Sequence, residues 1–121
     1  METYLPPNRQ LSLKAIALPH NHNVSKEAYN GWVLSQMHQA GCNIAACKTS
    51  SDVKVLSVND LVFYEPILDG DEVSYYAEII HKNHHSLTLH IEAWAHRASQ
   101  PNDIKITDGS FIFVVNDNKP N

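Results

Sequence analysis

The sequence EAYNGWVLSQMHQAGCNIAACK, which runs from Glu27 to Lys48, predicts one long α-helix. It contains no proline, and its main apolar residues recur at intervals of four, four, three and four positions: Tyr29, Val33, Met37, Ala40 and Ile44. This spacing places them along one face of a helix. Further apolar residues lie off that stripe, so we expect the helix to be buried on more than one side.

The segments on both sides of this helix have the patterns of β-strands. Before it, residues 11–18 begin with apolar/polar alternation and end at Pro19. After it, β-rich runs are separated by the turn Asp69-Gly70-Asp71 and by loops at 82–85 and 100–103; the runs are 53–58, 61–64, 73–81, 86–98 and 105–116. The predicted order is β-α-β-β-β-β. We therefore expect an α+β hotdog fold, a long antiparallel sheet wrapped around one central helix.

Composition indicates a single compact globular domain. The chain has 121 residues, of which 43% are hydrophobic and 18% charged, and it contains four glycines and six prolines. These values exclude a disordered or fibrous protein. We expect one domain spanning residues 1–121, with a core at about residues 11–116. A monomer of this size buries only about two-thirds of its unfolded surface, which is compatible with an oligomer.

Charge and hydropathy exclude several partners. Thirteen acidic and nine basic residues give a formal charge of −4, which is not typical of a nucleic-acid binder. No apolar stretch approaches the roughly 20 residues of a membrane span, and the first residues lack the pattern of a secretion signal. We expect no nucleic-acid or membrane partner and a cytoplasmic location. Cys42 and Cys47 are expected to be small, buried apolar residues.

A set of short motifs around and after the predicted helix resembles the pattern of a known family. Asn23 is followed by Gly31-Trp32 and then by Ser35-Gln36-Met37. Downstream, in the same order as in that family, come 63–66 (FYEP), 70–71 (GD) and 91–94 (IEAW). Over about residues 11–116, the chain is similar to the hotdog-fold bacterial acyl-CoA thioesterases.

This resemblance implies hydrolysis of acyl-CoA thioesters to a free acid and CoA. It places the catalytic carboxylate at Glu27, as general base or nucleophile, and the oxyanion site at backbone amides of residues 29–31, including Gly31. Asn23 is expected to orient the water or the thioester carbonyl. The resemblance also implies a site shared between subunits, so we expect a homodimer at least, and a tetramer or hexamer as the assembly. It implies no cofactor.

The phosphates of CoA require basic groups beside the pocket. The resemblance points to Arg97 and Lys82, and to Ser86, which matches a serine of the family at the start of a strand. His38 replaces an acidic residue of the family and is titratable, so it is a further candidate acid, base or hydrogen-bond donor.

One alternative function remains open from the sequence. The chain departs from the family pattern near the expected site at Lys26, Asn30, His38 and Glu65, which favours, as the second hypothesis, a hotdog protein that binds acyl groups or acyl-CoA, or serves as a structural subunit, without hydrolysis. The eight histidines suggest metal binding, and His20 and His22 before Glu27 imitate the start of a cupin metal motif. That motif lacks its other parts here, so we expect no metal site.

Overall fold

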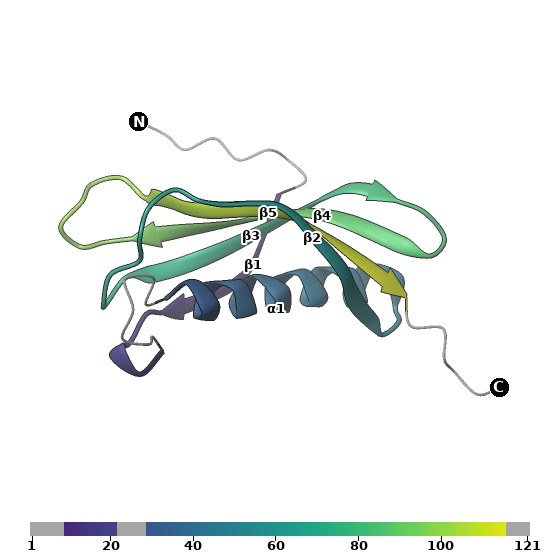
Figure 1. Cartoon of the computed structure of the whole chain (residues 1–121), viewed down its shortest axis with the longest axis horizontal. Coiled ribbons are helices and arrows are strands. Elements are labelled where there is room, and N and C mark those ends of the chain that lie inside the picture. Colours follow the sequence, from purple (N-terminus) through teal and green to yellow (C-terminus); the bar gives the residue numbers. More distant parts are fainter. Residues whose placement is uncertain (1–8, 22–28, 116–121) are drawn as a thin grey trace.

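The structure is a computed structural model that describes residues 9–21 and 29–115 (Figure 1). Glu27 and Asn23 lie outside these ranges. The described elements, in chain order, are β1 (Gln10–Ile16), a short 3-10 helix (Pro19–Asn21), α1 (Asn30–Thr49), β2 (Val53–Phe63), β3 (Glu72–Lys82), β4 (Ser86–His96) and β5 (Ile104–Val115). The predicted order of helix and strands is confirmed, and the 3-10 helix is the one described element that the sequence did not predict.

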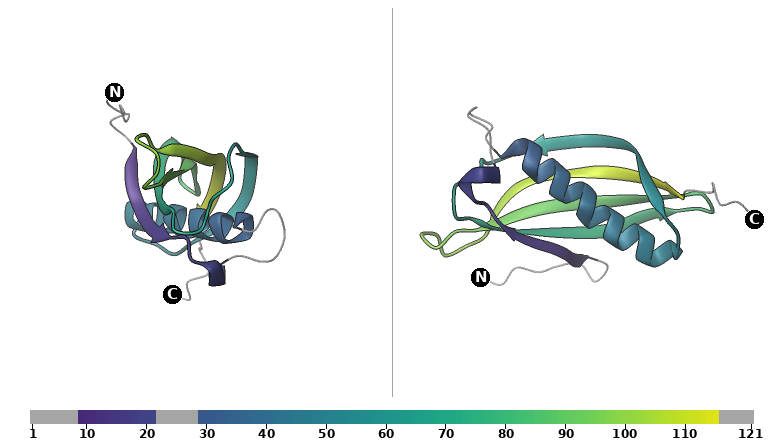
Figure 2. Two further views of the ribbon diagram at one scale, coloured as in Figure 1. Left: turned by 90° about the vertical axis from the view of Figure 1, so that its left-hand side faces the viewer. Right: turned by 90° about the horizontal axis from the view of Figure 1, so that it is seen from below.

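The five strands form one antiparallel sheet in the order β1-β3-β4-β5-β2. Strands β3, β4 and β5 form a meander in the middle, and β1 and β2 are the two edges. Helix α1 crosses one face of the curved sheet (Figure 2). The expected α+β architecture, a long antiparallel sheet around one helix, is therefore confirmed.

Strand β2 joins the two β-rich runs that the sequence showed at 53–58 and 61–64. Its pairing with β5 shifts register between Asn59 and Val62, and Asp60 between them has a φ of 56°. An extra residue of this kind bends the strand without ending it. The two runs are thus one edge strand with an irregularity near its middle.

The core lies between α1 and the inner face of the sheet. In β4 every second side chain is buried, from Leu87 to Ala95, and these face the buried Val33 and Met37 of α1. At Gly41 the helix lies close against the sheet, because a Cβ there would lie 2.5 Å from the Phe113 ring. A side chain at Gly41 would force the helix away from the sheet.

Helix α1 is covered on one face, so the expectation of burial on more than one side is wrong for the single chain. Leu34 is 37% exposed, Cys42 is half-buried and Cys47 is exposed. The expectation of buried thiols is therefore wrong as well, because one sheet can cover only one side of a helix. In the part of the chain that the structure describes, no helix has the length and apolar character needed to cross a membrane.

Candidate functional site

The first turn of α1 offers backbone amides without a side-chain cap. Tyr29, the N-cap residue, makes no side-chain hydrogen bond to the helix, and no acidic residue lies in the first turn. The amides at a helix start lack partners within the helix and carry the positive end of its dipole. Gly31 lies in this turn and is exposed, and a Cβ built on it would meet no atom within 4 Å. Packing within the chain therefore does not require glycine at this position.

The side chain of Tyr29 anchors this turn to a loop between β2 and β3. Tyr29 is 3% exposed, and its hydroxyl donates a hydrogen bond of 2.5 Å to Oδ1 of Asp69. Its ring also meets the Trp32 ring edge-on, with 5.7 Å between the ring centroids. Burial, and then the hydrogen bond to Asp69, raise the pKa of Tyr29 to about 12. The hydroxyl is therefore a donor throughout the neutral pH range.

The loop that holds Asp69 is itself fixed by a buried ion pair. Asp71 is 1% exposed, and its carboxylate accepts hydrogen bonds of 2.8 and 2.7 Å from Nε and Nη2 of Arg97 and one of 2.9 Å from the amide of Leu68. Burial alone would raise the pKa of Asp71, but the hydrogen bonds from Arg97 and Leu68 hold it below its ordinary value. Nη2 of Arg97 also donates to the Pro66 carbonyl, at 3.3 Å. Arg97 is thus tied into the fold.

The other end of the sheet has a pocket lined by basic groups. A pocket of about 690 Å³ lies there, lined by Lys48, Thr49, Ser51, Lys82, Asn83, His84 and Val115. Its lining includes no acidic residue, and neither Lys48 nor Lys82 forms an ion pair with any residue in 9–21 or 29–115. Ser86 lies beside this pocket, where its hydroxyl donates to Oδ1 of Asn83 at 3.2 Å.

The structure separates the three residues predicted to hold CoA. Strands β3 and β4 are antiparallel, so Glu72 at the start of β3 pairs with His96 at the end of β4. Arg97 follows His96, whereas Lys82 ends β3 and Ser86 begins β4. An 11-residue strand at about 3.3 Å per residue puts Arg97 and Lys82 about 30 Å apart. Within one chain, Lys82 and Ser86 lie together and Arg97 lies with Tyr29 and Asp69.

His38 lies beyond the first turn of α1. It is eight residues after Asn30, about 12 Å along the helix axis. Its ring stacks on Phe113 with 6.1 Å between centroids, and its Nε2 lies 3.5 Å from Sγ of Cys42. Within the chain, His38 is therefore not brought to the helix start, and a catalytic role for it stays a prediction.

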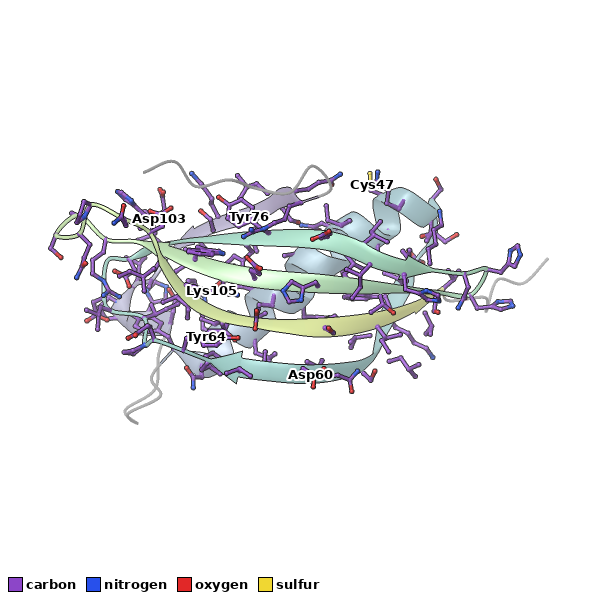
Figure 3. All side chains as sticks on the ribbon, turned by 90° about the horizontal axis from the view of Figure 1, so that it is seen from above. Cys47, Asp60, Tyr64, Tyr76, Asp103 and Lys105 are labelled. Carbon is purple, nitrogen blue, oxygen red and sulfur yellow. The ribbon has the colours of Figure 1, made fainter. Side chains whose placement is uncertain are left out.

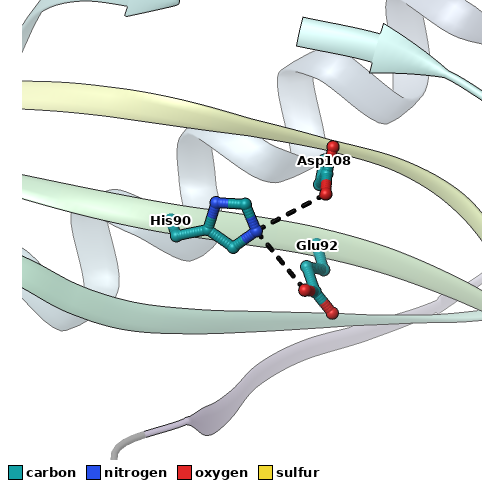
Figure 4. Close-up of side chains that lie close together, drawn as sticks. All are labelled: His90, Glu92 and Asp108. Carbon is teal, nitrogen blue, oxygen red and sulfur yellow. Dashed lines mark ion pairs between the residues drawn. The ribbon is translucent and has the colours of Figure 1, made fainter. Parts of the chain in front are cut away.

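Sequence reasoning missed a cluster of charged residues on the outer face of the sheet, opposite α1. Nε2 of His90 lies 3.3 Å from Oε2 of Glu92 and 3.5 Å from Oδ2 of Asp108 (Figure 4). These three side chains have the donor types of a metal site. Lys105, however, lies 2.8 Å from Asp108, and Arg9 pairs with Glu92. Both carboxylates already have a cationic partner, so we interpret the cluster as an ion-pair network.

The network continues to the neighbouring edge strand. Tyr64, just after β2, donates a hydrogen bond of 2.8 Å to Asp108, and Nζ of Lys105 lies 5.2 Å from the centre of the Tyr64 ring (Figure 3). Burial would raise the pKa of Asp108, but hydrogen bonds from Lys105 and Tyr64 hold it below its ordinary value. In the sequence, only the polar residues alternating along β4 hinted at this outward face.

Comparison with known proteins agrees with this architecture. The pattern of the Thioesterase superfamily matches residues 27–99, more than half of the chain. The chain belongs to the thioesterase superfamily. It is 30% identical over 118 residues to the acyl-CoA thioester hydrolase YciA of Escherichia coli K12, covering 95% of this chain and 89% of that protein.

Solved structures of the superfamily have the same fold. The hexameric thioesterase y2039 of Yersinia pestis superimposes with a TM-score of 0.85 at 32% identity, covering 98% of this chain and 97% of that one. The hexameric hotdog-fold thioesterase Cj0915 of Campylobacter jejuni gives a TM-score of 0.81 at 28% identity, covering 88% of this chain and 82% of that one. The expected family and the hotdog fold are both confirmed.

Proposed function

We propose that this protein hydrolyses acyl-CoA thioesters to a free acid and CoA. The observation that carries this proposal is the similarity along 95% of the chain to an acyl-CoA thioester hydrolase. The helix start supports it chemically, because its amides face no acidic side chain in the first turn and can stabilise the oxyanion of a tetrahedral intermediate.

Glu27 is the proposed general base or nucleophile, and Asn23 the residue that orients the water or the carbonyl. The amides at the start of α1, including that of Gly31, are the proposed oxyanion donors. The open space around Gly31 supports this role, since a substrate carbonyl can approach the backbone there without moving any described side chain.

The phosphates of CoA are proposed to bind at the hairpin between β3 and β4, with Lys82 and Ser86. The pocket beside these residues adds Lys48 and His84, and its lining holds no carboxylate that would repel phosphate. Arg97 is assigned a structural role instead, because its Nε and Nη2 already bond Asp71.

Pairing of two copies along β2 would bring the start of α1 in one copy and the hairpin between β3 and β4 in the other together in one site. Strand β2 is an edge of the sheet, and its exposed apolar residues are Val55, Leu56, Val58 and Val62. Such an edge is suited to pairing with a second copy. A two-fold axis would place the helix start of one subunit at the same end as the hairpin of its partner. We therefore propose a homodimer as the minimal unit. For the full assembly we propose a hexamer, as in y2039. We also propose a cytoplasmic location.

Thiol release from acyl-CoAs of several chain lengths tests the proposal. We expect turnover by the wild type and a loss of at least about a hundredfold in kcat for Glu27→Gln, which keeps the shape and removes the carboxylate. Gly31→Ala should keep the stability but lose activity, because only substrate approaches that backbone. The matched control is Glu72→Gln, which changes a half-buried carboxylate of β3 that pairs with Lys14 and should leave turnover unchanged.

Two results would contradict the proposal. A folded wild type that binds acyl-CoA without releasing thiol would establish the non-hydrolytic alternative. Full activity of Glu27→Gln would move the catalytic carboxylate elsewhere.

A further inference from the structure

The start of α1 has an anchor outside the helix. The carbonyl of Tyr29 accepts the first helical hydrogen bond, from the amide of Val33 at 2.8 Å. Its hydroxyl reaches across to Asp69, in a loop 40 residues further along the chain. One residue thus connects the backbone of the first turn to a different part of the fold.

The loop at the other end of this connection is held in place by several bonds. The amide of Gly70 donates to the carbonyl of Ala17 at 2.7 Å, and the amide of Ala17 donates to the carbonyl of Asp71 at 2.8 Å. Gly70 has a φ of 89°, a conformation that glycine adopts without strain. The buried carboxylate of Asp71 is bonded twice by Arg97. Asp69 is therefore carried on a loop that cannot easily shift.

We infer that the hydrogen bond from Tyr29 to Asp69 positions the first turn of α1 for thioester hydrolysis, so that Tyr29 and Asp69 are positioning residues of the site. The inference rests on the proposed function, because it needs the amides of that turn to be the oxyanion donors. The Tyr29 ring is buried among apolar residues and would pack without its hydroxyl. The hydroxyl instead fixes the ring, and the backbone attached to it, relative to the loop.

Catalysis is more sensitive than folding to a displacement of the first turn of α1. Displacing donors by about 1 Å can cost about a hundredfold in rate, while one hydrogen bond contributes little to overall stability. Asp69 is exposed, so its substitution leaves no hole in the core. Variants at either end of the bond should therefore fold and lose rate.

The test compares Tyr29→Phe and Asp69→Ala with two controls. Tyr64→Phe makes the same chemical change at an exposed tyrosine, whose hydroxyl donates to Asp108 on the outer face. Asp69→Asn keeps an acceptor oxygen for the Tyr29 hydroxyl. We expect Tyr29→Phe and Asp69→Ala to lower kcat by about ten- to a hundredfold with KM within about a factor of two. Tyr64→Phe and Asp69→Asn should stay close to wild type, and the double variant should be no worse than either single one.

Amide hydrogen exchange at Val33, the first hydrogen-bonded amide of the helix, and in the turn that follows it gives a readout that does not depend on activity. We expect several-fold faster exchange in Tyr29→Phe than in wild type or Tyr64→Phe. Unchanged exchange would overturn the positioning role, and faster exchange with unchanged kcat would overturn its link to catalysis. A wild type without hydrolysis would overturn the proposed function and the catalytic half of this inference together, while exchange would still decide the positioning half.

Discussion

The two ends of the sheet use basic residues in opposite ways. At the helix-start end, which carries Tyr29, Asp69, Asp71 and Arg97, the guanidinium of Arg97 is bonded to a buried carboxylate. At the hairpin end, which carries Lys48, Lys82 and His84, the basic groups line an open pocket without an acidic residue. A basic residue near a site is therefore not by itself a phosphate ligand. Whether its donors are already occupied by the fold decides its role.

The difference follows from what each end has to do. Under the proposed function the helix-start end holds backbone amides in a fixed place, and the buried ion pair of Asp71 with Arg97 gives it rigidity. Under the proposed function the hairpin end exchanges water for the phosphates of CoA, which requires that its cations stay available. Arg97 thus serves the fold, whereas Lys82, a basic residue at the opposite end of the neighbouring strand, is the one proposed to serve a ligand.

The largest expected effect is on stability at the helix-start end. Arg97→Ala would leave the buried carboxylate of Asp71 without its partner, and we expect a loss of about 3 kcal/mol in the free energy of unfolding. Lys82→Ala, the matched change at the hairpin end, should cost less than about 0.5 kcal/mol. Urea unfolding of both variants measures the contrast. Equal losses would show that the two ends do not differ in this way.

A smaller effect is expected on substrate binding at the hairpin end. Replacing Lys48 and Lys82 together by alanine should raise KM for acyl-CoA about tenfold with little change in kcat, because the proposed site has these charges contact phosphate and not the reacting carbonyl. The effect should shrink as salt is added. Lys14→Ala, at an exposed lysine of β1 that pairs with Glu72, is the control. A similar rise in KM for the control would argue against a local phosphate site.

The smallest expected effect is a pH dependence of the stability that Arg97→Ala loses relative to wild type. The pKa of Asp71 is held below its ordinary value of 3.8 in the fold. A carboxyl with a lowered pKa stabilises the fold above its ordinary pKa, and that contribution is lost as pH falls through the lowered value. The stability difference between wild type and Arg97→Ala should therefore be largest near neutral pH and shrink in acid. The decrease should begin above the ordinary value of 3.8, because burial without Arg97 raises the pKa of Asp71 in the variant. Urea unfolding from pH 7 to pH 3 measures it, and a difference that grows in acid would contradict the assigned pair.

The sequence predicted the parts of this fold that depend on local patterns. The apolar spacing between Tyr29 and Ile44 located α1, and alternation located most of β4. The turn at residues 69–71 and the hairpin loop at 82–85 were both predicted from turn residues and loop length. Each of these signals is contained within a few neighbouring residues.

The contacts between elements could not be predicted in the same way. Arg97 and Asp71 are 26 residues apart and meet only because of the register between β3 and β4. The same register places Lys82 at the far end of the sheet within the same chain, a separation that the sequence alone did not show. The exposure of Leu34 and Cys47 likewise depends on how far one sheet reaches around α1. The pairing of His90 with Asp108 also requires the register between β4 and β5.

The most direct test of the central claim, that each site combines the helix start of one subunit with the hairpin end of its partner, is a subunit-mixing measurement. Glu27→Gln is mixed in equal amounts with the Lys48→Ala/Lys82→Ala variant, allowed to exchange subunits, and assayed at acyl-CoA concentrations far below the KM of the lysine variant. Each mixed dimer would hold one site with both defects and one intact site, so the mixture should recover about a quarter of wild-type activity. Activity no higher than the average of the two separate variants would contradict the shared site.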